Sequence, residues 1–359
     1  MMDRRQVLQG AALGGMAFSM FGPASVLAAD DPYMRYIHPD LREMAQVFQG
    51  FAKNDKPLSM ATLAERRAGM ARFQRPLRKD VPVEKRTIPG VKGQPDVTFH
   101  LINSAPGKAR PAIVNTHGGG FVLGDAMSDV AGLQDICAEL GVVAISVEYR
   151  LAPETTWAGS VEDNYTALKW LHTNAASIGA DPARIAVLGG SAGGGHAALL
   201  AITARDRGEV PIAFQCLIYP MLDDRTGAFG RFGSKVPPHV GKLVWNAESN
   251  RFGWKAFLGQ EPGLAKAPKN AVPARLAELS GLPPAFIGVG SLDLFHDEDV
   301  EYARRLNDAG IGCELIVVPG AFHGFDLAGI FNPKNRLAAW FNAAKLDALR
   351  RGLGIAPAV

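Results

Sequence analysis

Residues 184–202 read RIAVLGGSAGGGHAALLAI, and this stretch decides the fold. An apolar segment typical of a buried strand runs into a turn of glycines around Ser191, and a helical pattern follows the turn. A serine between Gly189 and Gly193 on a strand-to-helix turn matches the nucleophile-elbow pattern G-x-S-x-G. Taken alone, the motif leaves a glycine-rich phosphate loop or a plain tight turn open as alternatives.

A nucleophile elbow at Ser191 would require small neighbouring residues and a strained backbone at the serine. Because the turn is tight, a Cβ at Gly189 or Gly193 would collide with the neighbouring strand or helix, and the nucleophile is held in strained backbone geometry. The hydroxyl of Ser191 is then exposed above the sheet edge at a helix N-terminus, where the helix dipole favours developing negative charge.

A serine hydroxyl is a weak nucleophile, so it needs a base, an acid that orients the base, and an oxyanion hole. In elbow-type folds the three triad members follow the order Ser, Asp or Glu, His. An apolar strand pattern at 286–289 leads to Asp293, and the next, at 315–318, leads to His323. Catalytic groups gather at the carboxyl ends of such strands. Asp223 and Asp224 also follow a strand pattern and are the alternative acid.

A second glycine run, His117-Gly118-Gly119-Gly120-Phe121, follows the apolar strand pattern at 112–116. Glycines directly after a strand let backbone N–H groups turn inward without obstruction. Aimed at a carbonyl under attack, such donors stabilise the oxyanion by about 3 kcal/mol each. The N–H of Ala192, at the start of the helix after the elbow, would add a further donor.

The rest of the chain alternates apolar strand patterns with amphipathic helical ones, which predicts an α/β fold with a mostly parallel sheet covered on both faces. We assign residues 86–221 and 283–359 to this catalytic domain. Residues 30–85 read as N-terminal cap helices. Residues 222–282 break the alternation with Gly, Pro and aromatic residues, and they are too long for a plain loop, so we expect an inserted cap.

Taken together, these motifs resemble the hormone-sensitive-lipase group of α/β-hydrolases, the bacterial family IV esterases. The resemblance covers residue 40 to the C-terminus and rests on HGGG at 117–120, YRLAPE at 149–154, GGSAGG at 189–194, Asp293 and His323. It implies Ser191 as nucleophile, His323 as base and Asp293 as orienting acid. It further implies oxyanion donors at Gly119, Gly120 and Ala192, and structural support from His117, Gly118, Gly189 and Gly193.

The resemblance has two departures. Family members mostly carry Asp or Thr before the nucleophile, where this chain has Gly190. Residues 155–158, TTWA, replace the usual proline-rich continuation. The first departure leaves the subgroup open without touching the geometry of the nucleophile.

Composition limits the other functions. The chain has 359 residues, 20% of them charged and 47% hydrophobic, and a net charge of +3 with no basic cluster interleaved with aromatics, so we expect no nucleic-acid partner. Three cysteines, at 137, 216 and 313, are too few and too widely spaced for a disulfide framework or a zinc site. The acidic residues 297–299 beside His296 look like a metal cluster, but acids are expected at a helix start, and we predict no metal and no cofactor.

The N-terminus, residues 1–29, has the layout of a twin-arginine-like signal peptide. Arg4 and Arg5 precede an uncharged stretch that ends in small residues. We therefore expect a periplasmic or secreted protein with no stable membrane insertion after signal removal. An uncleaved membrane anchor is the alternative.

The expected function is a serine carboxylesterase acting on small-molecule esters with short to medium acyl chains. A deacetylase of sugar or plant-polymer esters and an amide or formamide hydrolase are alternatives, because the same machinery serves acyl transfer generally. A catalytically silent ligand-binding protein is a further alternative from another class. The resemblance also allows a homodimer, formed through the last strand and helix.

Overall fold

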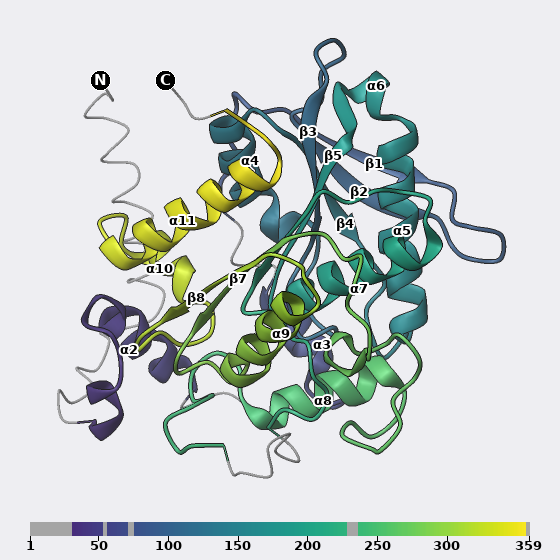
Figure 1. Ribbon diagram of the computed structural model, residues 1–359. Helices are drawn as coiled ribbons and strands as arrows, with labels where there is room; N and C mark the ends of the chain where they lie inside the picture. Colours follow the sequence, from purple (N-terminus) through teal and green to yellow (C-terminus); the bar gives the residue numbers. More distant parts are fainter. Residues whose placement is uncertain (1–30, 53–55, 71–74, 228–235, 357–359) are drawn as a thin grey trace.

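The central sheet has eight strands in the order β1-β2-β4-β3-β5-β6-β7-β8 (Figure 1). The structure is a computed structural model that describes residues 31–52, 56–70, 75–227 and 236–356. Its strands are β1 (Val83–Ile88), β2 (Val97–Ile102), β3 (Arg110–Thr116), β4 (Val143–Glu148), β5 (Ala180–Gly190), β6 (Phe214–Ile218), β7 (Ala285–Gly290) and β8 (Cys313–Val318). β2 is antiparallel to both β1 and β4, and all pairs from β4 to β8 are parallel, so the predicted fold class is confirmed.

Helices cover both faces of this sheet (Figure 1). They are α2 (Arg42–Ala52), α3 (Leu63–Met70), α4 (Met127–Leu140), α5 (Trp157–Thr173), α6 (Ala175–Ile178), α7 (Ala192–Arg207), α8 (Ala247–Leu258), α9 (His296–Asp308), α10 (Ala328–Phe331) and α11 (Arg336–Gly352). Short 3-10 turns lie at η1 (Pro32–Arg35), η2 (Pro39–Leu41), η4 (Pro273–Arg275) and η5 (Phe325–Leu327).

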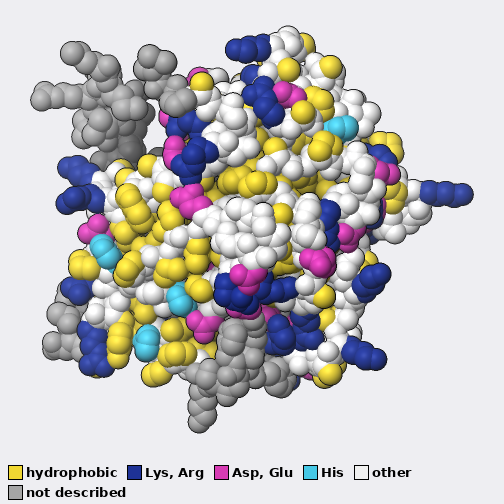
Figure 2. All heavy atoms as spheres, viewed as in Figure 1, with side chains coloured by type: hydrophobic (Ala, Val, Ile, Leu, Met, Phe, Trp, Pro, Cys, Tyr) yellow, Lys and Arg dark blue, Asp and Glu magenta, His cyan; other side chains and the backbone are white. Residues whose placement is uncertain are grey.

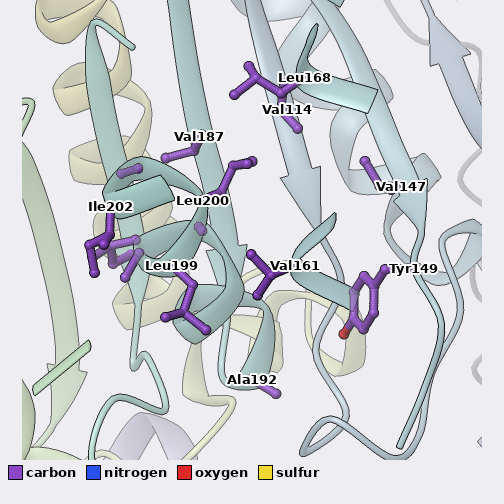
Figure 3. Packing of buried hydrophobic residues seen from close by; sticks show 14 of the residues in the cluster. Val114, Val147, Tyr149, Val161, Leu168, Val187, Ala192, Leu199, Leu200 and Ile202 are labelled. Carbon is purple, nitrogen blue, oxygen red and sulfur yellow. The ribbon is translucent and has the colours of Figure 1, made fainter. Parts of the chain in front are cut away.

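Side-chain alternation along the strands sends alternate residues to two separate core clusters. In β3, Val114 belongs to the cluster beneath α5, α7 and α9, whereas Ile113 belongs to the cluster beneath α4 and α11. Figure 3 shows part of the first cluster, with Leu200 of α7 drawn next to Val187 of the sheet. Burial on both faces explains why these strands read as continuous apolar runs.

The N-terminal helices expected in residues 30–85 are present as α2 and α3. The boundary predicted at residue 85 falls inside β1, whose run of charged residues gave no strand signal in the sequence. Tyr36, just after η1, stacks on His239 with 4.7 Å between ring centroids, so the N-terminal segment touches the insertion. The predicted signal peptide lies outside the described residues.

The insertion at 222–282 carries one α-helix among its described residues, α8, and the turn η4. Trp245, Trp254 and Phe257 are buried and belong to the same cluster as α5 and α7. The insertion therefore shares the core of the sheet instead of enclosing a core of its own.

Two further features of the molecule are the distribution of charged side chains on one face and the state of its three cysteines. On the face drawn in Figure 2, lysine and arginine side chains are scattered among acidic ones and form no single basic patch. All three cysteines are free thiols. Burial raises the pKa of Cys137 and of Cys216 to about 12, which keeps both thiols protonated and unreactive.

Candidate active site

Ser191 forms the turn between β5 and α7 and has a φ of 59°, a conformation that non-glycine residues rarely adopt. Gly189 and Gly193 lie so close to neighbouring backbone atoms that a side chain at either position would collide with them. A Cβ on Gly193 would lie 2.0 Å from the carbonyl oxygen of Thr116, and one on Gly189 would lie 2.3 Å from the carbonyl carbon of Gly193. Both expected collisions are present, so the tight turn holds the serine in strained geometry at the head of α7.

The structure brings Ser191, His323 and Asp293 together. His323 Nε2 lies 2.9 Å from Ser191 Oγ, and His323 Nδ1 lies 2.8 Å from Asp293 Oδ2. Asp293 is fully buried and also accepts a hydrogen bond from the N–H of Phe295 at 3.0 Å. A carboxylate at Nδ1 holds the proton on that nitrogen, which leaves Nε2 free to accept the serine proton.

The alternative acids are engaged elsewhere. Asp223 pairs with Arg225, with 2.7 Å between Oδ2 and Nη2. Asp224 pairs with Arg275, with 2.6 Å between Oδ1 and Nε. Since His323 meets Asp293 instead, the alternative assignment of the acid to Asp223 or Asp224 is wrong.

The acidic residues after Asp293 lie in the first turn of α9. The Nδ1 atom of His296 lies 2.7 Å from a carboxylate oxygen of Asp297, and Glu298 accepts a hydrogen bond from the N–H of Leu222 at 2.6 Å. Burial raises the pKa of Glu298 and of Asp299 well above the usual range, which favours their neutral forms. Across the described ranges, no group of three or more His, Cys, Asp or Glu side chains is placed to hold a metal ion.

The glycine loop after β3 runs beside the nucleophile. A Cβ on Gly118 would lie 3.6 Å from Ser191 Cβ. Gly119 and Gly120 have φ values of 121° and 60°, which glycine adopts without penalty. Among the described residues, the N–H groups of Gly119 and Gly120 donate to no backbone carbonyl. The N–H of Ala192 is likewise an unpaired first-turn donor of α7, so three backbone donors lie in the chain segments that flank Ser191 Oγ.

His117 supports this loop instead of reaching the nucleophile. Its Nδ1 lies 2.9 Å from the carbonyl oxygen of Gly118, and its ring stacks on Tyr149 with 4.1 Å between centroids. The Tyr149 hydroxyl donates to the His117 carbonyl at 2.6 Å. Burial lowers the pKa of His117, so the neutral ring is favoured.

Comparison with known proteins agrees with this geometry. A family model described as the α/β-hydrolase fold matches residues 113–327. The chain belongs to this family. The carboxylesterase NlhH of Mycobacterium tuberculosis is 36% identical to it over 286 residues, 76% of this chain and 84% of that protein. An ethyl acetate hydrolase of Pseudomonas putida is 33% identical over 61% of this chain and 67% of its own length.

Solved structures agree with the sequence relatives. A bacterial heroin esterase superposes with a TM-score of 0.79 and 35% identity, covering 89% of this chain and 98% of that chain. The esterase LipW of Mycobacterium marinum has a TM-score of 0.73 and 29% identity over 89% of this chain and 96% of its own. The predicted resemblance to bacterial esterases is therefore confirmed.

One site residue of this α/β-hydrolase was missed from the sequence. Tyr219 follows β6 with a φ of 36°, and its ring centroid lies 4.6 Å from that of His323. Its hydroxyl donates to Asp326 Oδ1 at 2.6 Å, and Asp326 in turn pairs with Lys345 at 3.6 Å. Its place directly after a parallel strand was the signal that could have identified it.

The departure at Gly190 has a structural counterpart. A Cβ at Gly190 would lie 3.5 Å from Tyr219 Cε2, an ordinary van der Waals contact. The glycine before the nucleophile thus faces the phenol ring beside His323, and the space beside that ring would accept a Cβ without a clash.

No helix in the described ranges has both the length and the apolar character needed to cross a membrane.

Proposed function

We propose that this α/β-hydrolase is a serine carboxylesterase that hydrolyses esters with short to medium acyl chains through an acyl-enzyme on Ser191. The carrying observation is the continuous hydrogen-bonded path from Ser191 Oγ through His323 to Asp293, with steps of 2.9 Å and 2.8 Å. The curated relatives named as carboxylesterase and carboxylic ester hydrolase support the same reaction class.

The first half-reaction transfers the acyl group to the enzyme. His323 Nε2 takes the hydroxyl proton while Ser191 Oγ attacks the carbonyl carbon, and the π electrons move to the carbonyl oxygen. The N–H groups of Gly119, Gly120 and Ala192 donate to that oxyanion. When it collapses, the bond to the alcohol oxygen breaks, and the imidazolium returns its proton to the leaving alcohol.

The second half-reaction regenerates the serine. His323 takes a proton from water, the hydroxide oxygen attacks the acyl carbon, and the same donors hold the second oxyanion. Collapse breaks the bond to Ser191 Oγ, which recovers its proton from His323 as the acid departs. Asp293 stabilises the imidazolium in both halves, and every step is carried by these residues and water.

A hydrolysis panel tests this function. We expect p-nitrophenyl esters from acetate to hexanoate to be cleaved faster than dodecanoate, and Ser191→Ala to lower kcat by at least about a thousandfold. Acetylated sugars and an anilide form separate arms for the deacetylase and amidase alternatives. Undiminished turnover by Ser191→Ala would contradict the mechanism. Turnover of the anilide alone would assign the protein to the amide hydrolases instead of the esterases.

We also propose that the chain is exported through a twin-arginine-like signal. The pair Arg4 and Arg5 before an uncharged stretch supports export. The three cysteines are free thiols, which fits a protein that folds before transport. N-terminal sequencing of the mature protein should find a start near residue 30 in the periplasmic or secreted fraction. A start at Met1 in the cytoplasm would contradict the proposal.

A homodimer along the free edge of the sheet is a further part of this proposal. In the described part of the chain, β8 pairs with β7 alone, and its residues are mostly half-buried. An open edge of this kind is a template for pairing with a second copy. Light scattering on the purified protein should give twice the chain mass; a monomer mass at every concentration would reject the dimer.

A further inference from the structure

The loop that carries the oxyanion donors has an unusual backbone. Three successive residues have positive φ: Gly119 at 121°, Gly120 at 60° and Phe121 at 67°. Phe121 is not a glycine, so its conformation persists only where the surroundings over-determine it. This backbone conformation therefore needs a restraint from outside the loop.

The insertion supplies it at Gly120. A Cβ on Gly120 would lie 2.1 Å from Cη2 and 2.6 Å from Cζ2 of Trp245, so the outer edge of the indole ring packs directly on the Gly120 Cα. A Cβ on Gly253 of α8 would lie 2.5 Å from the Gly120 carbonyl oxygen. Two residues of the insertion thus pack against the Cα and the carbonyl oxygen of Gly120, the residue whose N–H is a proposed oxyanion donor.

Trp245 is itself fixed in place. Its Nε1 donates to Asn250 Oδ1 at 3.2 Å, and Asn250 Nδ2 donates to the Thr226 carbonyl at 2.9 Å. Asn250 is fully buried and Trp245 is nearly so. The indole therefore has little freedom to move away from Gly120.

The next residue of the loop is held by the same helix. The Phe121 ring stacks on Phe257 of α8 with 3.9 Å between centroids and 14° between planes, and it meets Trp254 edge-on. Since Gly253, Trp254 and Phe257 all lie on α8, one helix fixes both Gly120 and Phe121.

We propose that Trp245 is a positioning residue that holds the Gly120 N–H in the direction of the oxyanion. The proposal deepens the esterase function and rests on it. A donor aimed at the oxyanion acts in the transition state more strongly than in the ground state, so loosening it should lower kcat and leave KM nearly unchanged. A residue that merely lined the substrate pocket would change KM or the acyl-chain preference instead.

The test compares Trp245→Phe with Trp245→Ala. Phenylalanine is shorter than the indole and withdraws the ring edge from Gly120 while keeping an aromatic ring in the core. Rates are normalised to active sites titrated with a fluorophosphonate, so that a loss of folded protein does not count as a loss of kcat. Trp340→Phe, at a half-exposed site on α11, is the matched control.

We expect kcat for p-nitrophenyl acetate to fall about 10- to 100-fold in Trp245→Phe, less than the roughly 100- to 1000-fold loss that follows complete removal of one oxyanion donor, because the donor is loosened and not removed. KM should stay within about twofold, and affinity for a trifluoromethyl ketone, which mimics the tetrahedral oxyanion, should fall by the same factor as kcat. Trp245→Ala should show the larger loss if it folds, and Trp340→Phe should match the wild type.

Wild-type kcat and ketone affinity in folded Trp245→Phe would overturn the proposal, as would a change confined to KM. Failure of the esterase function itself is separate: the wild type would then show no hydrolysis that depends on Ser191. In that case the proposed role of Trp245 would be rejected together with the esterase function.

Discussion

The elbow at Gly189–Gly193 and the loop at Gly118–Phe121 are both glycine turns that follow parallel strands, yet they are held in different ways. Each contains one non-glycine residue with positive φ, Ser191 at 59° and Phe121 at 67°. The elbow is locked by its own glycines against each other and against the adjacent end of β3. The loop depends on α8, Trp245 and other residues far away in sequence. The glycine pattern that forms the elbow is therefore visible in the local sequence, whereas the loop also depends on packing against a distant insertion.

The largest effect is expected from breaking the elbow. In Gly193→Ala the new Cβ would lie 2.0 Å from the Thr116 carbonyl oxygen, so strand and helix must separate. We expect a loss of at least about 3 kcal/mol in the free energy of unfolding, or no soluble protein. Gly132→Ala on α4, where no atom lies within 4 Å of the new Cβ, is the control and should be stabilised by about 0.5–1 kcal/mol. Equal stability of the two variants in urea would contradict a locked elbow.

His196 lies on α7, the helix that follows the elbow, and its ring contacts Phe121 of the loop edge-on with 5.1 Å between ring centroids. Neither ring nitrogen has a hydrogen-bond partner among the described residues. Burial lowers its pKa from 6.5 to about 3. Below pH 6.5 the unfolded chain binds a proton that the folded chain does not, so stability falls as the pH falls toward 3, by about 1.4 kcal/mol per pH unit.

Replacing His196 by leucine should remove that slope. Relative to the wild type, we expect His196→Leu to gain about 2 kcal/mol of stability on going from pH 7 to pH 5. Urea unfolding at the two pH values measures the difference. His172→Leu, at a half-buried position on α5, should keep the wild-type dependence. Parallel pH dependence of His196→Leu and the wild type would show that the imidazole is not buried as a neutral ring.

The smallest effect is expected from the N-terminal support of the loop. Arg67 on α3 donates to the Val122 carbonyl at 2.8 Å and to the Ala152 carbonyl at 2.9 Å. We expect Arg67→Met to lose about 1–2 kcal/mol of stability, because both carbonyls lose a charged donor, together with a few-fold loss of kcat. Arg86→Met on β1 is the control. A change in stability without any change in kcat would mean that α3 does not help to hold the loop.

The same contrast explains what the sequence could predict. Triad order and position after β5, β7 and β8 follow from strand patterns, and the structure places Ser191, Asp293 and His323 together at hydrogen-bonding distance. β1 was missed because its charged residues Glu84, Lys85 and Arg86 lack the apolar signal of a buried strand.

The supports of the site could not be predicted from the sequence. Trp245 meets Gly120 across more than a hundred residues of chain, and nothing in either local pattern encodes that contact. The hydrogen bond of Tyr219 to Asp326 has the same character. Such pairs are fixed by how the insertion and the last helices pack on the sheet, which is a property of the whole fold.

Peptide mass spectrometry after fluorophosphonate labelling tests the central claim most directly. The account predicts one adduct, on the peptide that contains Ser191, and much slower labelling in His323→Ala, because that variant lacks the base that activates the serine. Absence of an adduct, an adduct on another residue, or unchanged labelling in His323→Ala would contradict the account.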